Sequence, residues 1–126
     1  MNYGVVLPIW QLSAREAESL TVRAEALGLD GVFVPDHILA KPATTQHYGG
    51  HWPDPFALLA YLAGRTHRIR LGASVIVLPY RNALVAAKAA ATVDQVSNGR
   101  FIFGVGVGWT RRSSWTCGCR STSAGV

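Results

Sequence analysis

The sequence predicts an α/β fold built on a parallel sheet, and three observations lead to this prediction. Between Arg70 and Trp109, an apolar β-branched run, an alanine-rich helical segment and a second apolar run follow one another. Strands that alternate with helices along a chain form parallel sheets. The apolar runs are nearly continuous, as expected of strands covered on both faces. The same alternation in the preceding residues gives an expected total of four strands and three helices.

The first two strands and the helix between them are expected within residues 3–34. Tyr3–Leu7 is a short apolar strand, and Gly31–Val34 is the second strand. Ser13, followed three residues later by Glu16, has the spacing of a capping box that begins a helix. Residues at helical intervals form the expected apolar face of this helix: Ala17, Leu20, Ala24 and Leu27.

A long loop, residues 36–53, separates this unit from the rest and holds three of the four histidines. Loops of that length within a compact domain are usually functional or disordered. Asp54 is the expected N-cap of a second helix, whose buried stripe is Phe56, Leu59, Ala60 and Ala63. The remaining expected elements are a strand at Leu71–Leu78, a helix at Asn82–Val96 and a strand at Phe101–Val107.

The net charge of +5 does not indicate a nucleic-acid partner. Up to Trp109 the chain carries nine basic and seven acidic residues, a balance of +2, and the basic residues do not cluster with aromatic ones. No apolar run approaches the ~20 residues of a membrane span, and the N-terminus does not resemble a signal peptide. We therefore expect a cytoplasmic protein with no nucleic-acid or membrane partner.

Metal binding is not expected either. His47 and His51 have helical spacing, but two glycines lie between them and disfavour a helix. Cys117 and Cys119 have no second pair to complete a tetrahedral zinc site, and two cysteines are too few for a disulfide framework.

The glycine pattern helps to choose between the two architectures that fit, an open doubly wound sheet and an eight-stranded barrel. A dinucleotide-binding fold places a glycine-rich turn after its first strand, where this chain has Pro8-Ile9-Trp10. Its glycines at 104, 106 and 108 lie in and after the fourth strand instead. Glycines inside a strand often mark the close approach of a ligand or another backbone.

Three stretches together resemble the luciferase-like monooxygenase superfamily, particularly its enzymes that depend on the deazaflavin coenzyme F420. They are Asp36-His37 after the second strand, LGASVIVLPYRN at 71–82 and SNGRFIFGVGVGW at 97–109. Members are TIM (β/α)8 barrels with the flavin or deazaflavin ring at the C-terminal ends of the strands. The resemblance implies that residues 1–109 form the N-terminal half of such a barrel, about four βα units.

The resemblance also implies a set of site residues. His37 would carry a proton beside the ring, with Asp36 next to it, and an adjacent carboxylate can fix the tautomer of an imidazole. Ser74-Val75 matches a non-proline cis peptide that supports the ring. Val77 stands where some members carry a hydroxyl, and Gly106, Val107 and Gly108 would contact the cofactor. Trp10 and Trp52 are candidates for a substrate pocket.

The implied activity is hydride transfer between F420 and a small organic substrate. An alternative is an FMN-dependent monooxygenase that uses O₂ and flavin reduced by a partner reductase. The Asp-His pair, in place of the Glu-His-His run of some FMN members, favours F420. A third alternative is a truncated, inactive fragment, which could form a homo-oligomer because half a barrel leaves two strand edges unpaired.

The tail at 110–126, TRRSSWTCGCRSTSAGV, resembles neither the family nor a helix, and we expect it to be disordered. One choice of GC-rich codons for it, read one base later, spells AEEFVDLRVPFDERGR, which has the acidic and aromatic character of the family at this place. We interpret the tail as the product of a frameshift. This hypothesis fails if the encoding codons give no family-like peptide in the shifted frame.

Overall fold

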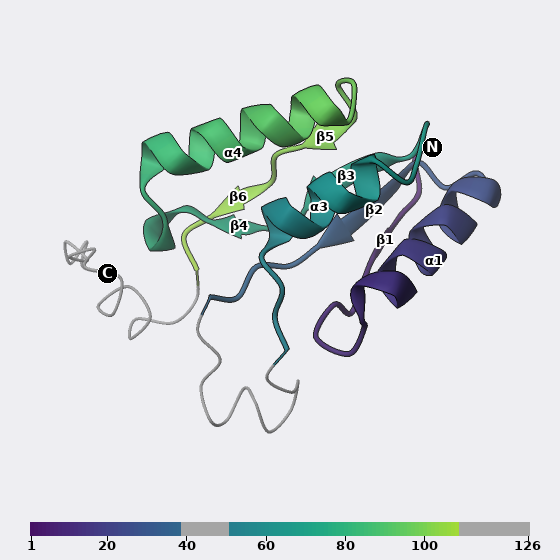
Figure 1. Cartoon of the computed structure of the whole chain (residues 1–126), viewed down its shortest axis with the longest axis horizontal. Coiled ribbons are helices and arrows are strands. Elements are labelled where there is room, and N and C mark those ends of the chain that lie inside the picture. Colours follow the sequence, from purple (N-terminus) through teal and green to yellow (C-terminus); the bar gives the residue numbers. More distant parts are fainter. Residues whose placement is uncertain (39–50, 109–126) are drawn as a thin grey trace.

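The computed structural model describes residues 1–38 and 51–108, and four parallel strands organise them (Figure 1). The sheet order is β1-β2-β3-β5, so each strand pairs with the one that precedes it in this order. A doubly wound sheet reverses its strand order at a switch point, whereas a barrel adds each strand on the same side. The strands are β1 (Gly4–Val6), β2 (Gly31–Val34), β3 (Arg70–Ala73) and β5 (Phe101–Ile102). The predicted parallel α/β architecture is confirmed.

The third and fourth strand positions are each divided into two segments, where the sequence predicted single strands. β4 (Ile76–Val77) continues β3 after a cis peptide bond between Ser74 and Val75, and β6 (Val105–Gly106) continues β5. β4 and β6 pair in parallel as a second, two-stranded sheet. The break between β5 and β6 has a local cause. The amide of Gly104 donates to the carbonyl of Ile102 two residues earlier, at 3.1 Å, and not to a neighbouring strand.

The end of the predicted third strand is also not extended. Residues Leu78–Tyr80 form a short 3₁₀ helix, η1, which begins at the residue before Pro79. Proline has no amide hydrogen to donate to a strand ladder, so the strand cannot continue through it. Instead, the amide of Arg81 donates to the carbonyl of Leu78, at 2.9 Å. The next helix follows this turn. The Arg81 side chain at its end pairs with Asp36, which follows β2.

Each helix begins at a side-chain cap, as the sequence predicted for the first two. The helices are α1 (Ala14–Ala26), α3 (Pro55–Ala63) and α4 (Ala83–Val96). The capping box at α1 is confirmed: Glu16 accepts from the amide of Ser13 at 2.7 Å, and Ser13 accepts from that of Glu16 at 3.3 Å. Asp54 caps α3 by accepting from the amide of Ala57, and the side chain of Asn82 caps α4 in the same way.

The core lies between the sheet and these helices. Val32, Val34 and Leu71 point into it from the strands and are fully buried. The helices contribute a list of mostly small or branched side chains: Ala17, Ala24, Leu59, Leu62, Ala90 and Val93. The predicted apolar face of α1 was partly wrong, because Leu20 and Leu27 are 43% and 73% exposed. Ala17, Thr21 and Ala24 face the core instead. Their small size lets α1 lie close to the strands.

The opposite face of the sheet is only partly covered by the described residues. Val6, Phe33, Gly72 and Ile102 stand in one row across it, as the strand register requires. Val6 is 51% exposed, and the Phe33 ring lies over Gly72, where a Cβ atom would come within 2.4 Å of it. In a closed barrel this row faces the interior.

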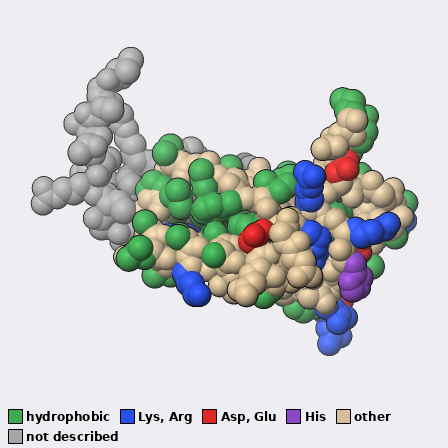
Figure 2. Space-filling model, turned by 90° about the horizontal axis from the view of Figure 1, so that it is seen from above, with side chains coloured by type: hydrophobic (Ala, Val, Ile, Leu, Met, Phe, Trp, Pro, Cys, Tyr) green, Lys and Arg blue, Asp and Glu red, His purple; other side chains and the backbone are tan. Residues whose placement is uncertain are grey.

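Large apolar side chains are also exposed on α4. Leu84 and Val85 are 81% and 67% exposed, and Val96 is 49% exposed. Figure 2, which views the molecule from the α4 side, shows hydrophobic side chains gathered on this face with few charges among them. Helices of a globular protein normally turn such residues towards a neighbouring element. The described residues supply none on this side.

Arg100, which precedes β5, binds the end of α3 and the segment that leads into β3 through an extended set of hydrogen bonds. Its guanidinium donates to the carbonyls of Ala63, Thr66 and Ile69, at 2.9, 3.1 and 2.9 Å. It also reaches the Thr66 hydroxyl and the carbonyl of Ser97. The carbonyl of Ala63 lies in the last turn of α3 and has no partner within the helix, so Arg100 supplies a donor for it.

Glu25 provides a comparable link at the end of α1. One of its carboxylate oxygens accepts the amides of His67, Arg68 and Ile69, at 2.9, 2.5 and 2.9 Å. Burial raises the pKa of Glu25, but these three amides lower it by more, so that the net pKa lies below its ordinary value of 4.5. The ionised carboxylate therefore holds the segment that leads into β3.

We expect Glu25→Gln to lower stability at neutral pH and to have no effect in acid. Since folding lowers this pKa, the stabilisation is present above the unfolded pKa of about 4.3 and is lost as pH falls through the folded value. Urea denaturation at pH 7 and at pH 3 measures the difference between the wild-type chain and the variant. A difference that is the same at both pH values would contradict the role given to the charge.

Candidate functional site

A cavity of about 190 Å³ lies at the carboxyl ends of β2 and β3. Such ends are where parallel α/β barrels carry their active sites. Six of the eight residues predicted for the site line it: Asp36, His37, Ser74, Val75, Val77 and Gly108. Pro35, Trp52 and Tyr80 complete the lining. Gly106 and Val107 are not among the lining residues, and Val107 is 82% exposed.

Asp36 is engaged in a way that the sequence did not indicate. Its side chain is 1% exposed, and one carboxylate oxygen accepts the amide of Val77 at 3.0 Å. The other oxygen pairs with Nη2 of Arg81 at 2.9 Å, and Nε of the same guanidinium lies 3.4 Å from the first. Burial lowers the pKa of Arg81, but its bonds to Asp36 and Asp54 raise it by more, so the guanidinium stays charged.

His37 is oriented by the backbone and not by the neighbouring carboxylate, which corrects the sequence expectation. Nδ1 of the imidazole lies 3.0 Å from the carbonyl oxygen of Asp36. A carbonyl can only accept, so Nδ1 is the nitrogen that carries hydrogen and Nε2 is the basic nitrogen of the neutral ring. The Asp36 carboxylate contacts Val77 and Arg81, while its main-chain carbonyl contacts the imidazole.

Two tryptophans extend the wall beside His37. The Trp52 ring lies 4.6 Å from the His37 ring, centroid to centroid, and 5.2 Å from that of Trp10. Trp52 lines the small cavity, whereas Trp10 lines a separate and larger one. Each tryptophan thus lines a cavity, and their role in a substrate pocket stays a prediction.

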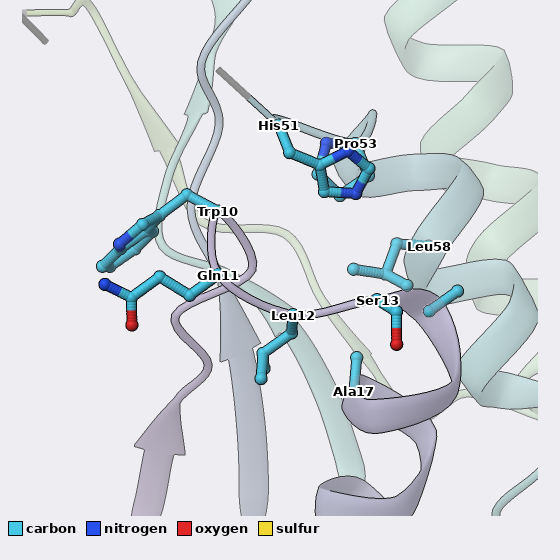
Figure 3. A pocket seen from close by; sticks show the side chains of 9 residues that line it. Trp10, Gln11, Leu12, Ser13, Ala17, His51, Pro53 and Leu58 are labelled. Atoms are coloured by element: carbon cyan, nitrogen blue, oxygen red, sulfur yellow. The ribbon is translucent and has the colours of Figure 1, made fainter. Parts of the chain in front are cut away.

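The larger cavity, of about 530 Å³, lies between the start of α1 and the segment leading into α3 (Figure 3). Leu12, Ala17 and Leu58 give it an apolar floor, and Gln11, Ser13 and His51 are its polar members. Of these, Ser13 already serves as the cap of α1. None of the residues expected to be catalytic lines this cavity, so it is distinct from the site at Asp36 and His37.

The glycines of the fourth strand position have a packing role. A Cβ atom on Gly106 would lie 2.6 Å from the side chain of Val75, and one on Gly104 would lie 2.1 Å from the carbonyl oxygen of Ala73. Both glycines therefore let this strand approach its neighbour. Gly108 has a φ of 77° and lies against Val77 and Tyr80 at the cavity wall.

Sequence reasoning missed Tyr80 and Arg81, which follow the third strand position. Their only signal was their place in LGASVIVLPYRN, since an arginine after a proline has no chemical signature of its own. His47, Trp109, Cys117 and Cys119 lie outside the described residues, as does the predicted tail at 110–126.

Within residues 1–38 and 51–108, no group of three His, Cys, Asp or Glu side chains is placed to hold a metal ion. The helices of the same ranges are too short or too polar to cross a bilayer.

We expect Gly106→Ala to destabilise the fold by about 1–3 kcal/mol, because the new methyl group would overlap Val75. In a Val75→Ala background the same change should cost clearly less, since the overlapping atoms are gone. Gly104→Ala is the matched control, because its methyl group would meet backbone and no side-chain truncation can relieve it. Chemical denaturation measures all four variants. Equal costs of Gly106→Ala in both backgrounds would contradict this packing account.

Comparisons with solved structures place the fold among barrel enzymes. The monooxygenase RslO1 from Streptomyces bottropensis matches with a TM-score of 0.76 and 26% identity over 96% of this chain and 37% of its own. The coenzyme F420-dependent tetrahydromethanopterin reductase from Methanopyrus kandleri matches with a TM-score of 0.71 and 25% identity, over 95% and 30%. An FMN complex of 3,6-diketocamphane monooxygenase from Pseudomonas putida, at 22% identity and a TM-score of 0.74, shares the fold. The parallel strands are thus those of the N-terminal half of a TIM barrel.

Curated relatives include F420-dependent glucose-6-phosphate dehydrogenases from Amycolatopsis mediterranei, 43% identical, and Kribbella flavida, 41% identical. Both matches cover 78% of this chain, which spans only 28% of the length of each relative. The sequence model of the family described as luciferase-like monooxygenase matches residues 1–115. With the parallel strands and the residues gathered at their carboxyl ends, this match shows that the chain belongs to the luciferase-like monooxygenase family.

Proposed function

We propose that this chain carries part of the ring-binding site of an F420-dependent oxidoreductase that acts on a small organic molecule. The observation that supports this most directly is the cavity in which His37 meets the apolar wall of Val75, Val77 and Gly108. F420-dependent enzymes are among its relatives at 43% and 41% identity. Since the chain spans 28% of their length, the substrate and activity of the complete enzymes are proposals for this one.

The lining fits one side of a flat, mainly apolar ring system. Val75 is 39% exposed and offers an apolar surface, and Gly108 lies against the side chains of Val77 and Tyr80. The volume of about 190 Å³ is smaller than the roughly 300–1,000 Å³ of most small-molecule sites. The described residues thus supply one wall, and we expect this chain alone to bind the cofactor only weakly.

In this proposal His37 handles a proton. The carbonyl of Asp36 holds hydrogen on Nδ1, which leaves Nε2 to accept a proton from the substrate or return one. Trp52, packed on the imidazole, limits its rotation and excludes water from one of its faces. A bound deazaflavin would accept or donate the hydride. Asp36 has a structural part in this proposal, because its carboxylate is paired with Arg81.

The second candidate is an FMN-dependent monooxygenase, which would need O₂ and flavin reduced by a partner reductase. The FMN complex of the same fold supports it, although at 22% identity that structure informs on the fold alone. A third possibility is that the chain is an inactive fragment that associates with itself. The exposed apolar residues of α4 and the open row at Val6 and Phe33 favour association of some kind.

We expect the purified 126-residue chain to bind F420 weakly and saturably, and FMN more weakly still. Gly108→Ala should reduce this binding, because the methyl group would press on Val77 and Tyr80 at the cavity wall. Gly28→Ala is the matched control: Gly28 also has a positive φ, of 80°, but it lies after α1 with nothing within 4 Å of an added Cβ. Cofactor fluorescence measures affinity while light scattering reports the oligomeric state.

Binding of neither cofactor would argue against a ring site in this chain, and a preference for FMN would favour the monooxygenase. Tight one-to-one binding of either would contradict the expectation that more of the barrel is needed. An equal loss of affinity in Gly108→Ala and Gly28→Ala would mean that contacts at the cavity wall do not cause the loss.

A further inference from the structure

Arg81 does not line the cavity itself, but it connects three parts of the chain beside it. It follows η1, and its guanidinium pairs with Asp36 after β2 and with Asp54 at the start of α3, at 2.9 and 2.8 Å. The same group lies 5.3 Å from the centroid of the Phe56 ring. Its side chain is 16% exposed, so it is largely removed from water.

The bond to Asp36 carries the most weight, because both partners are buried. Asp36 is 1% exposed and would be costly to keep ionised without a cation. With Arg81 in place, the carboxylate also accepts the amide of Val77, which fixes the end of β4 against the segment that follows β2. Two walls of the cavity, one with His37 and one with Val75 and Val77, are joined through this one carboxylate.

Asp54 is the second carboxylate that Arg81 binds, and it lies close in sequence to Trp52, which lines the cavity. Asp54 uses one oxygen to cap α3 through the amide of Ala57 and the other to accept from Arg81. Asp54 is 45% exposed, so this arm is weaker than the buried one. The ion pair nevertheless ties the start of α3, which follows Trp52 closely, to the Arg81 guanidinium.

We propose that Arg81 is a positioning residue of the site: through Asp36 it sets the place of the His37 imidazole relative to the Val75 and Val77 wall. The His37 ring follows Asp36 directly, because its Nδ1 is bound to the Asp36 carbonyl. Lysine cannot replace this function, since an ammonium group is a point charge and lacks the planar fork that reaches two oxygens of one carboxylate and a second carboxylate together. This proposal depends on the proposed function only for the identity of the ligand that the cavity binds.

The test compares Arg81→Lys with Arg65→Lys in the full chain. Arg65 is the matched control because it also pairs with a carboxylate, Glu18, at 2.6 Å, but it is 57% exposed and does not line the cavity. We expect Arg81→Lys to accelerate hydrogen exchange at the Val77 amide about tenfold and to shift the imidazole resonances of His37. The Leu71 amide, bonded to the carbonyl of Arg100 within the sheet, should change far less. Arg65→Lys should move none of these signals.

Unchanged Val77 exchange and His37 resonances in Arg81→Lys would overturn the proposal, and so would equal acceleration at Val77 and Leu71, which would indicate a general loss of stability. Should Arg81→Lys not fold, Asp54→Asn decides the matter. Asparagine is also a good N-cap, so α3 is kept while one arm of Arg81 is lost. A smaller shift of the same signals in the same direction supports the proposal, and no shift overturns it.

Titration of the same variants with F420 and FMN separates this proposal from the function. Weaker binding in Arg81→Lys than in Arg65→Lys supports both. If the wild-type chain binds neither cofactor while the Val77 and His37 signals respond as expected, the proposed function fails in this chain and the positioning role stands.

Discussion

The parallel register of β1, β2, β3 and β5 is the constraint on which the rest of the structure depends. Each strand is bonded to its neighbour in the same direction, so all carboxyl ends lie at one edge. Residues that are far apart in the chain, Asp36 and Val77 among them, meet there because of this alignment. The helices satisfy the other requirement of a parallel sheet, which is cover for its apolar face.

Charged side chains then fix how the helices and loops attach to this sheet. Glu25 binds the amides that lead into β3, Arg100 binds the carbonyls after α3, and Arg81 binds two carboxylates below the cavity. Each places one charged group against several partners from a distant segment. Such contacts are directional, so they specify one arrangement where apolar packing alone would allow several. The site is therefore held by the same kind of interaction as the scaffold.

Much of the fold could be predicted from the sequence because its signals are local. Ser13 with Glu16, and Asp54 before Pro55, mark helix starts through bonds within one turn. The division of the third and fourth strand positions did not follow from the residue pattern, since apolar character is the same on both sides of Ala73 and Phe103; only the resemblance implied the cis bond after Ala73. The buried face of α1 was misjudged at Leu20 because hydrophobicity does not say which neighbour is present.

The candidate site, like the fold, could be predicted only in part. His37, Ser74 and Val75 could be named because they lie in stretches that resemble a known family, and the cis bond between the last two is found where the resemblance implied it. The partners of Asp36 could not, because Arg81 lies 45 residues further along and only the folded chain brings them together. Pairing of that kind leaves no pattern in the order of residues.

The Phe33 ring has a consequence for how this chain can vary. A Cβ atom on Gly4, Gly31 or Gly72 would lie 2.8, 3.1 or 2.4 Å from that ring, so one aromatic side chain occupies the space of three missing ones. The side chains at these four positions therefore share one space on the open face of the sheet. A larger residue at any of the glycines is compatible with the fold only if Phe33 shrinks or moves, and a smaller residue at Phe33 leaves a gap that the glycines cannot fill. Substitutions at these four positions are therefore expected to be epistatic, so that each is tolerated only together with another.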